Sequence, residues 1–199
     1  MKRCEFVITG GPCAGKTTAI NIVKEELEKN GFKVIIVPET ATELINSGIC
    51  PWELETQTFQ SILISRLFNK SETVRKAAEK MKEDVIIIYD RGLLDAKAYM
   101  EDNLFEEELK KYNVNEKMIN ESYDCVFHLV TAAEGAEAFY TLQNNEARKE
   151  TIDEARVLDK RTLECWSNHK NLKIIDNSTD FENKINRLLK EINLVIEKK

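Results

Sequence analysis

The segment at residues 10–17 constrains the fold of this chain more than any other, because it reads GGPCAGKT. It matches the pattern G-x-x-x-x-G-K-[ST], in which glycines let successive backbone N–H groups converge on phosphate oxygens. An apolar run over residues 4–9 predicts a strand before it, and the apolar spacing over residues 16–29 predicts a helix after it. This order favours a chain that binds nucleotide phosphates, because the helix N-terminus adds the positive end of its dipole.

Four further apolar runs predict strands that alternate with helical patterns. The strands cover residues 33–37, 85–89, 123–130 and 172–175, and helices are predicted over residues 53–81 and 180–196. This alternation predicts an α/β fold with a parallel sheet and right-handed crossovers. With only 3 prolines and 7 glycines no long linker is visible, so residues 1–199 are predicted to form a single domain. A polar segment at about residues 142–161 is the candidate for a lid-like insertion.

The phosphate loop assigns a role to most of its residues. Lys16 is expected to reach the β- and γ-phosphates of a nucleoside triphosphate, and the Thr17 hydroxyl is expected to bind Mg²⁺. The residues predicted to bind the nucleotide here are Gly10, Gly11, Pro12, Cys13, Ala14, Gly15, Lys16, Thr17 and Thr18. The nucleotide is predicted to be ATP, with GTP as the alternative, because the chain lacks the guanine-reading Asn-Lys-x-Asp signature.

A second magnesium ligand is expected at the end of a buried strand. Asp90 follows the β-branched run at residues 85–89 and meets this expectation, so Thr17 and Asp90 are the predicted metal ligands. Arg91 comes next, where its charge would lie beside the phosphates and steady a transferring phosphoryl group. The alternative is that Asp90 is an ordinary cap of a helix starting at Gly92.

Glu39 follows the second predicted strand, and ligands of open α/β sheets lie beyond the carboxyl ends of strands. Its carboxylate could accept a proton from a substrate hydroxyl, or it could simply favour the N-terminus of the next helix. Asp95 is a weaker candidate for substrate contact and is expected on the surface. Trp52 could line a substrate pocket with Gln57 and Gln60, although packing in the core or at an edge is the commoner role of tryptophan.

Three arginines lie in the lid candidate, at Arg148, Arg156 and Arg161. Arginine forks bind phosphate oxygens, and a closing segment would keep water away from phosphoryl transfer. Arg156 is therefore the predicted catalytic arginine, and Arg148 is assigned to the nucleotide. The alternative is an exposed helix with internal ion pairs, such as Arg156 with Asp159.

Asn177 and Ser178 lie in a polar loop after the fifth predicted strand. Loops at this place can contact the nucleotide base through backbone groups, so both residues are predicted to bind the nucleotide. A Ser, Thr or Asp cap of the helix that begins near Phe181 is the alternative, and it is compatible with a base contact.

Composition narrows the partners. The net charge of −6 disfavours a general attraction to nucleic acid or anionic membranes, so no nucleic-acid partner is expected. The 5 cysteines are widely spaced without a CxxC pair, which argues against zinc and for reduced thiols. No apolar run approaches the roughly 20 residues of a membrane helix, and we expect a cytoplasmic protein. Neither His128 nor His169 is assigned to catalysis.

Several segments together resemble the NadR/TTD14-like AAA domain family of P-loop proteins. They are the phosphate loop within residues 8–18, PETATELI at residues 38–45, DRGLLD at residues 90–95, DNS at residues 176–178, and residues 145–151 and 155–159 with Trp166. The resemblance covers nearly the whole chain. It implies a three-layer α/β/α P-loop NTPase fold with a parallel five-stranded sheet in the order 2-3-1-4-5, as in nucleoside and nucleoside-monophosphate kinases.

Motifs and resemblance together favour a kinase-like enzyme that moves the ATP γ-phosphate to a hydroxyl of a small, nucleoside-like acceptor. The predicted catalytic residues are Lys16, Glu39, Asp90, Arg91 and Arg156. Some family members are regarded as GTP-binding regulators, so the alternative is a regulatory module with slow hydrolysis. A second pocket near Glu39, Asp95 and Trp52 would favour the kinase hypothesis. The acceptor and the oligomeric state stay open.

Overall fold

A computed structural model describes residues 1–140 and 151–199 of the chain. A five-stranded sheet in the order β2-β3-β1-β4-β5 lies at its centre, and every adjacent pair of strands is parallel. The strands are β1 (Arg3–Thr9), β2 (Lys33–Val37), β3 (Val85–Asp90), β4 (Cys125–Leu129) and β5 (Leu172–Ile175). The predicted fold class and strand order are therefore confirmed.

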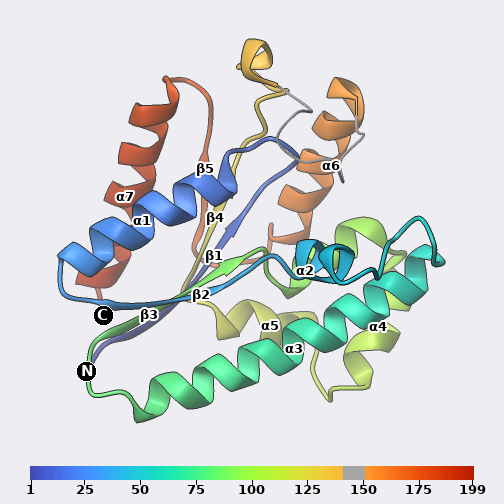
Figure 1. Ribbon diagram of the computed structural model, residues 1–199, viewed down its shortest axis with the longest axis horizontal. Coiled ribbons are helices and arrows are strands. Elements are labelled where there is room, and N and C mark those ends of the chain that lie inside the picture. Colours follow the sequence, from blue (N-terminus) through green and yellow to red (C-terminus); the bar gives the residue numbers. More distant parts are fainter. Residues whose placement is uncertain (141–150) are drawn as a thin grey trace.

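Helices cover both faces of the sheet and give a three-layer α/β/α arrangement (Figure 1). On one face lie α1 (Lys16–Lys29) and α7 (Phe181–Glu197). The other face is covered by α3 (Thr56–Lys80), η1 (Leu93–Tyr99), α4 (Asp102–Lys110), α5 (Glu116–Ser122) and α6 (Ile152–Cys165). Two short helices, α2 (Thr40–Asn46) and η2 (Glu137–Phe139), follow β2 and β4.

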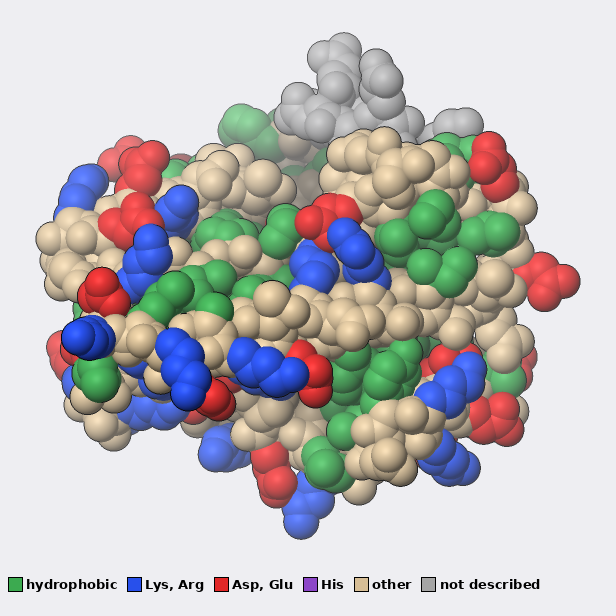
Figure 2. Space-filling model, turned by 60° about the horizontal axis from the view of Figure 1, so that its bottom comes forward, with side chains coloured by type: hydrophobic (Ala, Val, Ile, Leu, Met, Phe, Trp, Pro, Cys, Tyr) green, Lys and Arg blue, Asp and Glu red, His purple; other side chains and the backbone are tan. Residues whose placement is uncertain are grey.

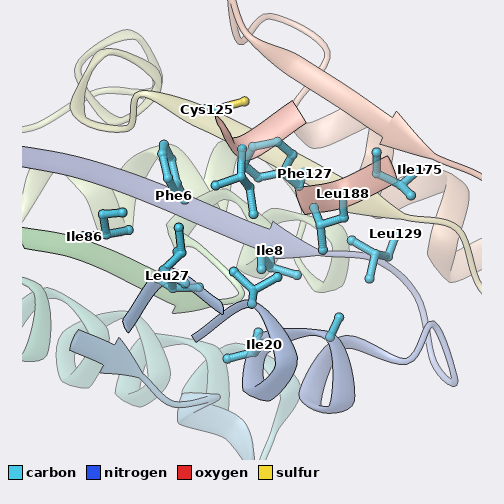
Figure 3. Close-up of a cluster of buried hydrophobic side chains, with 14 of the residues drawn as sticks. Phe6, Ile8, Ile20, Leu27, Ile86, Cys125, Phe127, Leu129, Ile175 and Leu188 are labelled. Carbon is cyan, nitrogen blue, oxygen red and sulfur yellow. The ribbon is translucent and has the colours of Figure 1, made fainter. Parts of the chain in front are cut away.

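The central strands are buried on both faces, because successive side chains of a strand point to opposite sides of the sheet. Ile86 and Ile88 of β3 pack on the side of α1 and α7, while Ile87 packs on the opposite side. Figure 3 shows the cluster of buried apolar side chains on the side of α1 and α7. In it the rings of Phe6 and Phe127 meet edge to face with centroids 5.7 Å apart. This double cover explains why the strands read as nearly continuous apolar runs in the sequence.

The structure departs from the sequence prediction mainly between the strands. The helix predicted over residues 53–81 begins at Thr56, and α4 and α5 were not predicted. These two helices have 9 and 7 residues, which is too short for a sustained apolar period to stand out. Trp52 is 63% exposed in the turn before α3, so the expectation of a packed tryptophan was wrong.

The surface carries both signs of charge. On the face shown in Figure 2, lysine and arginine side chains are interspersed with aspartate and glutamate. Cys4 and Cys125 are buried, and burial raises the pKa of the Cys125 thiol to about 12. Within the described residues, no helix has the length and apolar character needed to cross a membrane.

Candidate functional site

The phosphate loop joins the carboxyl end of β1 to the first turn of α1 and depends on its glycines. Gly10 has a φ of +141° and Gly15 has a φ of +79°, values that residues with a Cβ rarely adopt. A Cβ built on Gly10 would clash with the carbonyl oxygen of Leu129, at the end of the neighbouring strand β4. The backbone of the loop is thus held close to β4, which only glycine at this position allows.

Lys16 organises the loop from within. Its side chain is 5% exposed, and its Nζ donates hydrogen bonds of 3.0 Å to the carbonyl oxygens of Gly10 and Gly11. Thr17 and Thr18 are exposed on the first turn of α1. Two hydroxyl groups therefore lie at the helix N-terminus, where the dipole favours an anion.

Two buried carboxylates from outside the loop fix its entry. Asp95 of η1 accepts a hydrogen bond from the Thr9 hydroxyl, at the last residue of β1. Asp159 of α6 accepts one from the backbone N–H of Gly11 over 2.6 Å, and the Nε2 of the buried His128 lies 3.2 Å from the same oxygen. Asp95 and Asp159 thus hold the residues on either side of Gly10.

The role of Asp159 was not predicted from the sequence, in which this residue was a candidate only for an ion pair with Arg156. The signal was available, because Ala155, Asp159 and Thr162 share the helical spacing i, i+4, i+7 and form the buried face of α6. A carboxylate on the apolar side of a helix needs hydrogen-bond donors, and here backbone N–H groups provide them.

Asp95 connects several parts of the site. It is 3% exposed, so its expected place on the surface was wrong. Its Oδ1 lies 3.2 Å from Nη1 of Arg91, and its Oδ2 accepts hydrogen bonds from the backbone N–H of Gly92 and from Nε1 of Trp166. A charged residue in the first turn of a helix usually faces solvent, but Trp166 at the end of α6 covers Asp95.

Glu39 and Arg91 form an ion pair between the ends of β2 and β3. Nε of Arg91 donates to Oε1 of Glu39 over 2.7 Å, and the Thr42 hydroxyl donates to Oε2 over 2.7 Å. The backbone of Arg91 is left-handed, with a φ of +68°, and its side chain contacts the carboxylates of Glu39 and Asp95. Burial alone would lower the pKa of Arg91, but the neighbouring Tyr99 and the two carboxylates outweigh burial and raise it. Arg91 therefore stays charged.

Asp90 ends β3 beside Ile8 of β1, two residues before the phosphate loop begins, and is 9% exposed. The N-cap residue of the next helix is Gly92, whose N–H donates to Asp95, so Asp90 does not occupy the cap position. No cluster of three or more metal-binding side chains occurs within residues 1–140 and 151–199. A carboxylate and the Thr17 hydroxyl still fit Mg²⁺, which prefers oxygen and usually takes few protein ligands beside phosphates.

A cavity of about 180 Å³ opens between the phosphate loop and the helices α2 and α3. Its apolar lining consists of Pro12, Ala41, Ile45, Pro51, Phe59, Leu63, Leu67, Ala96 and Tyr99. Its polar lining consists of Glu39, Thr40, Thr42, Gln60, Asp90, Arg91 and Asp95. The cavity thus joins a residue of the loop to the acceptor-side residues that the sequence predicted. Trp52 is not part of its lining, although the preceding Pro51 is.

The lid candidate is described only in part. Arg148 lies outside the described residues, whereas residues 151–161 belong to α6 and the residue that caps it. Nε of Arg156 donates to the Ala133 carbonyl over 2.8 Å, and its guanidinium pairs with Glu137 and Asp153. The ion pair with Asp159 that we considered as an alternative does not form, because Asp159 faces the phosphate loop.

Phe181, the first residue of α7 after the β5 loop, reaches the phosphate loop. A Cβ on Gly15 would lie 2.5 Å from the ring of Phe181, so this half-exposed ring covers the start of α1. The Asn177 side chain bonds the carbonyls of Thr131 and Glu134, and the Ser178 hydroxyl bonds Asp176. These bonds hold the loop beside the predicted donor site, and the backbone N–H of Ser178 donates to Asp176.

The sheet order, the glycine-dependent loop between β1 and α1, and its buried lysine define a P-loop nucleotide-binding protein. Over residues 5–184 the chain matches the sequence model of a family described as an AAA domain. The chain therefore belongs to this AAA domain family, as the resemblance in its motifs predicted. P-loop NTPases generally bind a nucleotide with Mg²⁺. No curated protein matches the chain.

Proposed function

We propose that this protein is a phosphotransferase that moves the γ-phosphoryl group of ATP to a hydroxyl group of a small, nucleoside-like molecule. The observation that carries the proposal is the cavity beside the phosphate loop. Pro12 belongs to the loop and lines the same space as Glu39 and Arg91. A protein that only hydrolysed nucleotide would need room for a water molecule, whereas this cavity is large enough for an organic acceptor.

On the donor side, Lys16 would exchange its bonds to the loop carbonyls for bonds to the β- and γ-phosphates. Thr17 and Asp90 would hold Mg²⁺, which supplies positive charge at the phosphate oxygens when it is bound. The backbone near Asn177 and Ser178 would contact the base. Arg148 and Arg156 would bind the moving phosphoryl group, for which Arg156 has to leave Glu137 and Asp153.

On the acceptor side, Glu39 would take the proton of the attacking hydroxyl group. A bond forms between the acceptor oxygen and the γ-phosphorus while the bond from that phosphorus to the bridging oxygen of ADP breaks. ADP leaves with the electron pair of the broken bond, and the proton resides on Glu39. Arg91 and Thr42 orient the Glu39 carboxylate, and each uses one lone-pair site on an oxygen that has another.

The test is a screen of nucleosides and related alcohols for ATP-dependent phosphorylation, read out by the mass of the product. Glu39→Gln should lower transfer to the best acceptor by about 10²- to 10⁴-fold, the usual contribution of a general base. ATP binding, measured by calorimetry, should stay close to that of wild type. Glu53→Gln is the matched control, because Glu53 is exposed in the turn before α3.

A different result would identify the regulatory alternative. If no acceptor outpaces water and Glu39→Gln leaves turnover unchanged, the phosphotransferase proposal is wrong. Strong discrimination between ATP or GTP and their diphosphates, without acceptor turnover, would then indicate a nucleotide-dependent binding module.

A further inference from the structure

Gln60 is a buried polar side chain whose carbonyl oxygen has no hydrogen-bond partner among the described residues. The residue is 6% exposed, and its Oε1 is buried without a donor nearby. Buried side-chain polar atoms are partnered in the large majority of cases, because an unsatisfied one loses its hydration without compensation. Gln60 lines the cavity beside the phosphate loop, and a half-turn of its terminal amide exchanges the places of Oε1 and Nε2, so a molecule in the cavity can supply the missing donor.

The surroundings of Gln60 define the kind of group that carries this donor. Leu63 and Leu67 follow Gln60 on α3 at the spacing i, i+3, i+7, so all three share one face of the helix, and Phe59 adds an aromatic ring. This part of the wall is apolar, whereas Glu39 and Arg91 lie at the polar part. A matching ligand is apolar on its faces, has an N–H group on one edge, and carries its hydroxyl elsewhere.

We propose that Gln60 is the specificity residue of the acceptor site, and that its Oε1 accepts a hydrogen bond from an amino or ring N–H group of a nitrogen heterocycle. This inference rests on the proposed phosphotransferase function and names its acceptor class as nucleosides with such a donor. The cavity volume of about 180 Å³ favours a single ring, because it lies below the ~300 Å³ at which pockets for drug-sized ligands begin.

Three pyrimidine ribonucleosides of nearly equal shape distinguish recognition of an N–H donor by Gln60 from a general affinity for nucleosides. Cytidine carries a 4-amino group and uridine carries a ring N–H, whereas 2-pyrimidinone ribonucleoside has neither donor. Binding of each is measured by calorimetry with the full chain, in the presence of Mg²⁺ and a non-hydrolysable ATP analogue. Transfer from ATP to each is measured separately as kcat and KM.

Wild type should bind cytidine or uridine roughly 5- to 150-fold more tightly than the 2-pyrimidinone nucleoside, the range expected when a buried acceptor stays unsatisfied. Gln60→Met keeps the length of the side chain without its acceptor and should reduce this ratio to about 1. Gln60→Leu is a second variant of different shape with the same expectation. Gln57→Met is the control, because Gln57 is exposed one turn earlier on α3, and it should keep the wild-type ratio.

The outcomes separate the two proposals. A preference that wild type shows in binding and Gln60→Met loses supports the role of Gln60, even if no phosphate is transferred and the proposed function fails. Phosphate transfer without such a preference, or a preference that survives in both Gln60 variants, overturns the role of Gln60 and leaves the proposed function standing. If none of the three nucleosides binds, the assignment of the acceptor class is wrong.

Discussion

The two sides of the candidate site are built in different ways. The donor side is one continuous loop between β1 and α1, whose own lysine bonds its carbonyls. The acceptor side is assembled from residues distant in sequence, which include Glu39 after β2, Gln60 on α3 and Arg91 after β3. A continuous motif can be recognised from local sequence, whereas an assembled cavity exists only once the sheet has formed.

The two sides nevertheless share a support. Asp95 accepts a hydrogen bond from Thr9 at the entry of the phosphate loop, and it also pairs with Arg91, which holds Glu39 on the acceptor side. A single buried carboxylate thus couples the position of the loop to the position of the proposed general base. This arrangement predicts that loss of Asp95 disturbs both sides of the site at once.

The largest expected effect is therefore that of Asp95→Ala. It leaves the largely buried guanidinium of Arg91 without one of its carboxylates and removes the acceptor of Trp166. Breaking a buried ion pair costs about 3–5 kcal/mol, and urea unfolding should show a loss of this size. The control is Asp102→Ala, since Asp102 is 79% exposed and its loss should stay within about 1 kcal/mol. Equal losses in both variants would contradict the supporting role of Asp95.

The same contrast explains what the sequence could predict. The strand order and the phosphate loop followed from local patterns and from the family resemblance. Asp95 and Asp159 were misjudged because charged residues of a helix usually face solvent. Here their burial depends on contacts with Trp166 and Gly11, which lie far away in the sequence. Gln60 was named beside Gln57, but only the packing of α3 shows that the first is buried and the second exposed.

Lys16→Met should affect the donor side alone. Loss of the side chain that bonds Gly10 and Gly11 from within the loop removes charge stabilisation of the phosphates. ATP-dependent turnover should fall by about 10²- to 10³-fold, as when one preorganised donor is removed from a transition state. The control is Lys29→Met at the exposed end of α1. If nucleoside binding fell as much as turnover, the two sides would not be separable in this way.

Asp159→Ala tests whether the loop is self-sufficient. It leaves the buried N–H groups of Gly11 and Thr131 without their acceptor, which should cost about 1–3 kcal/mol in urea unfolding. Asp159→Asn keeps an oxygen at this place and should recover most of the loss. Should the alanine variant be as stable as wild type, the phosphate loop would hold its shape without support from α6.

The smallest expected effect is on the pH dependence of stability, and it comes from Lys184 of α7. Lys184 is 3% exposed and its Nζ donates to the Val130 carbonyl and to Oδ1 of Asn177, in the loop predicted to contact the base. Burial lowers the pKa of Lys184 to about 8, whereas an unfolded lysine has a pKa of about 10.4. Between these values the unfolded chain binds more protons than the folded one, so the free energy of unfolding rises with pH.

From about pH 7 to about pH 9 this gain should be roughly 1 kcal/mol in wild type relative to Lys184→Met, measured by urea unfolding at both values. The difference between the two proteins isolates Lys184 from every other group that titrates in this range. Lys190→Met, at an exposed position of the same helix, should follow wild type. A wild type that loses stability relative to Lys184→Met over this pH rise would mean that the folded protein stabilises the ammonium form. In that case folding would raise the pKa of Lys184 instead of lowering it, and the loop that contains Asn177 would be held by a charged ammonium group.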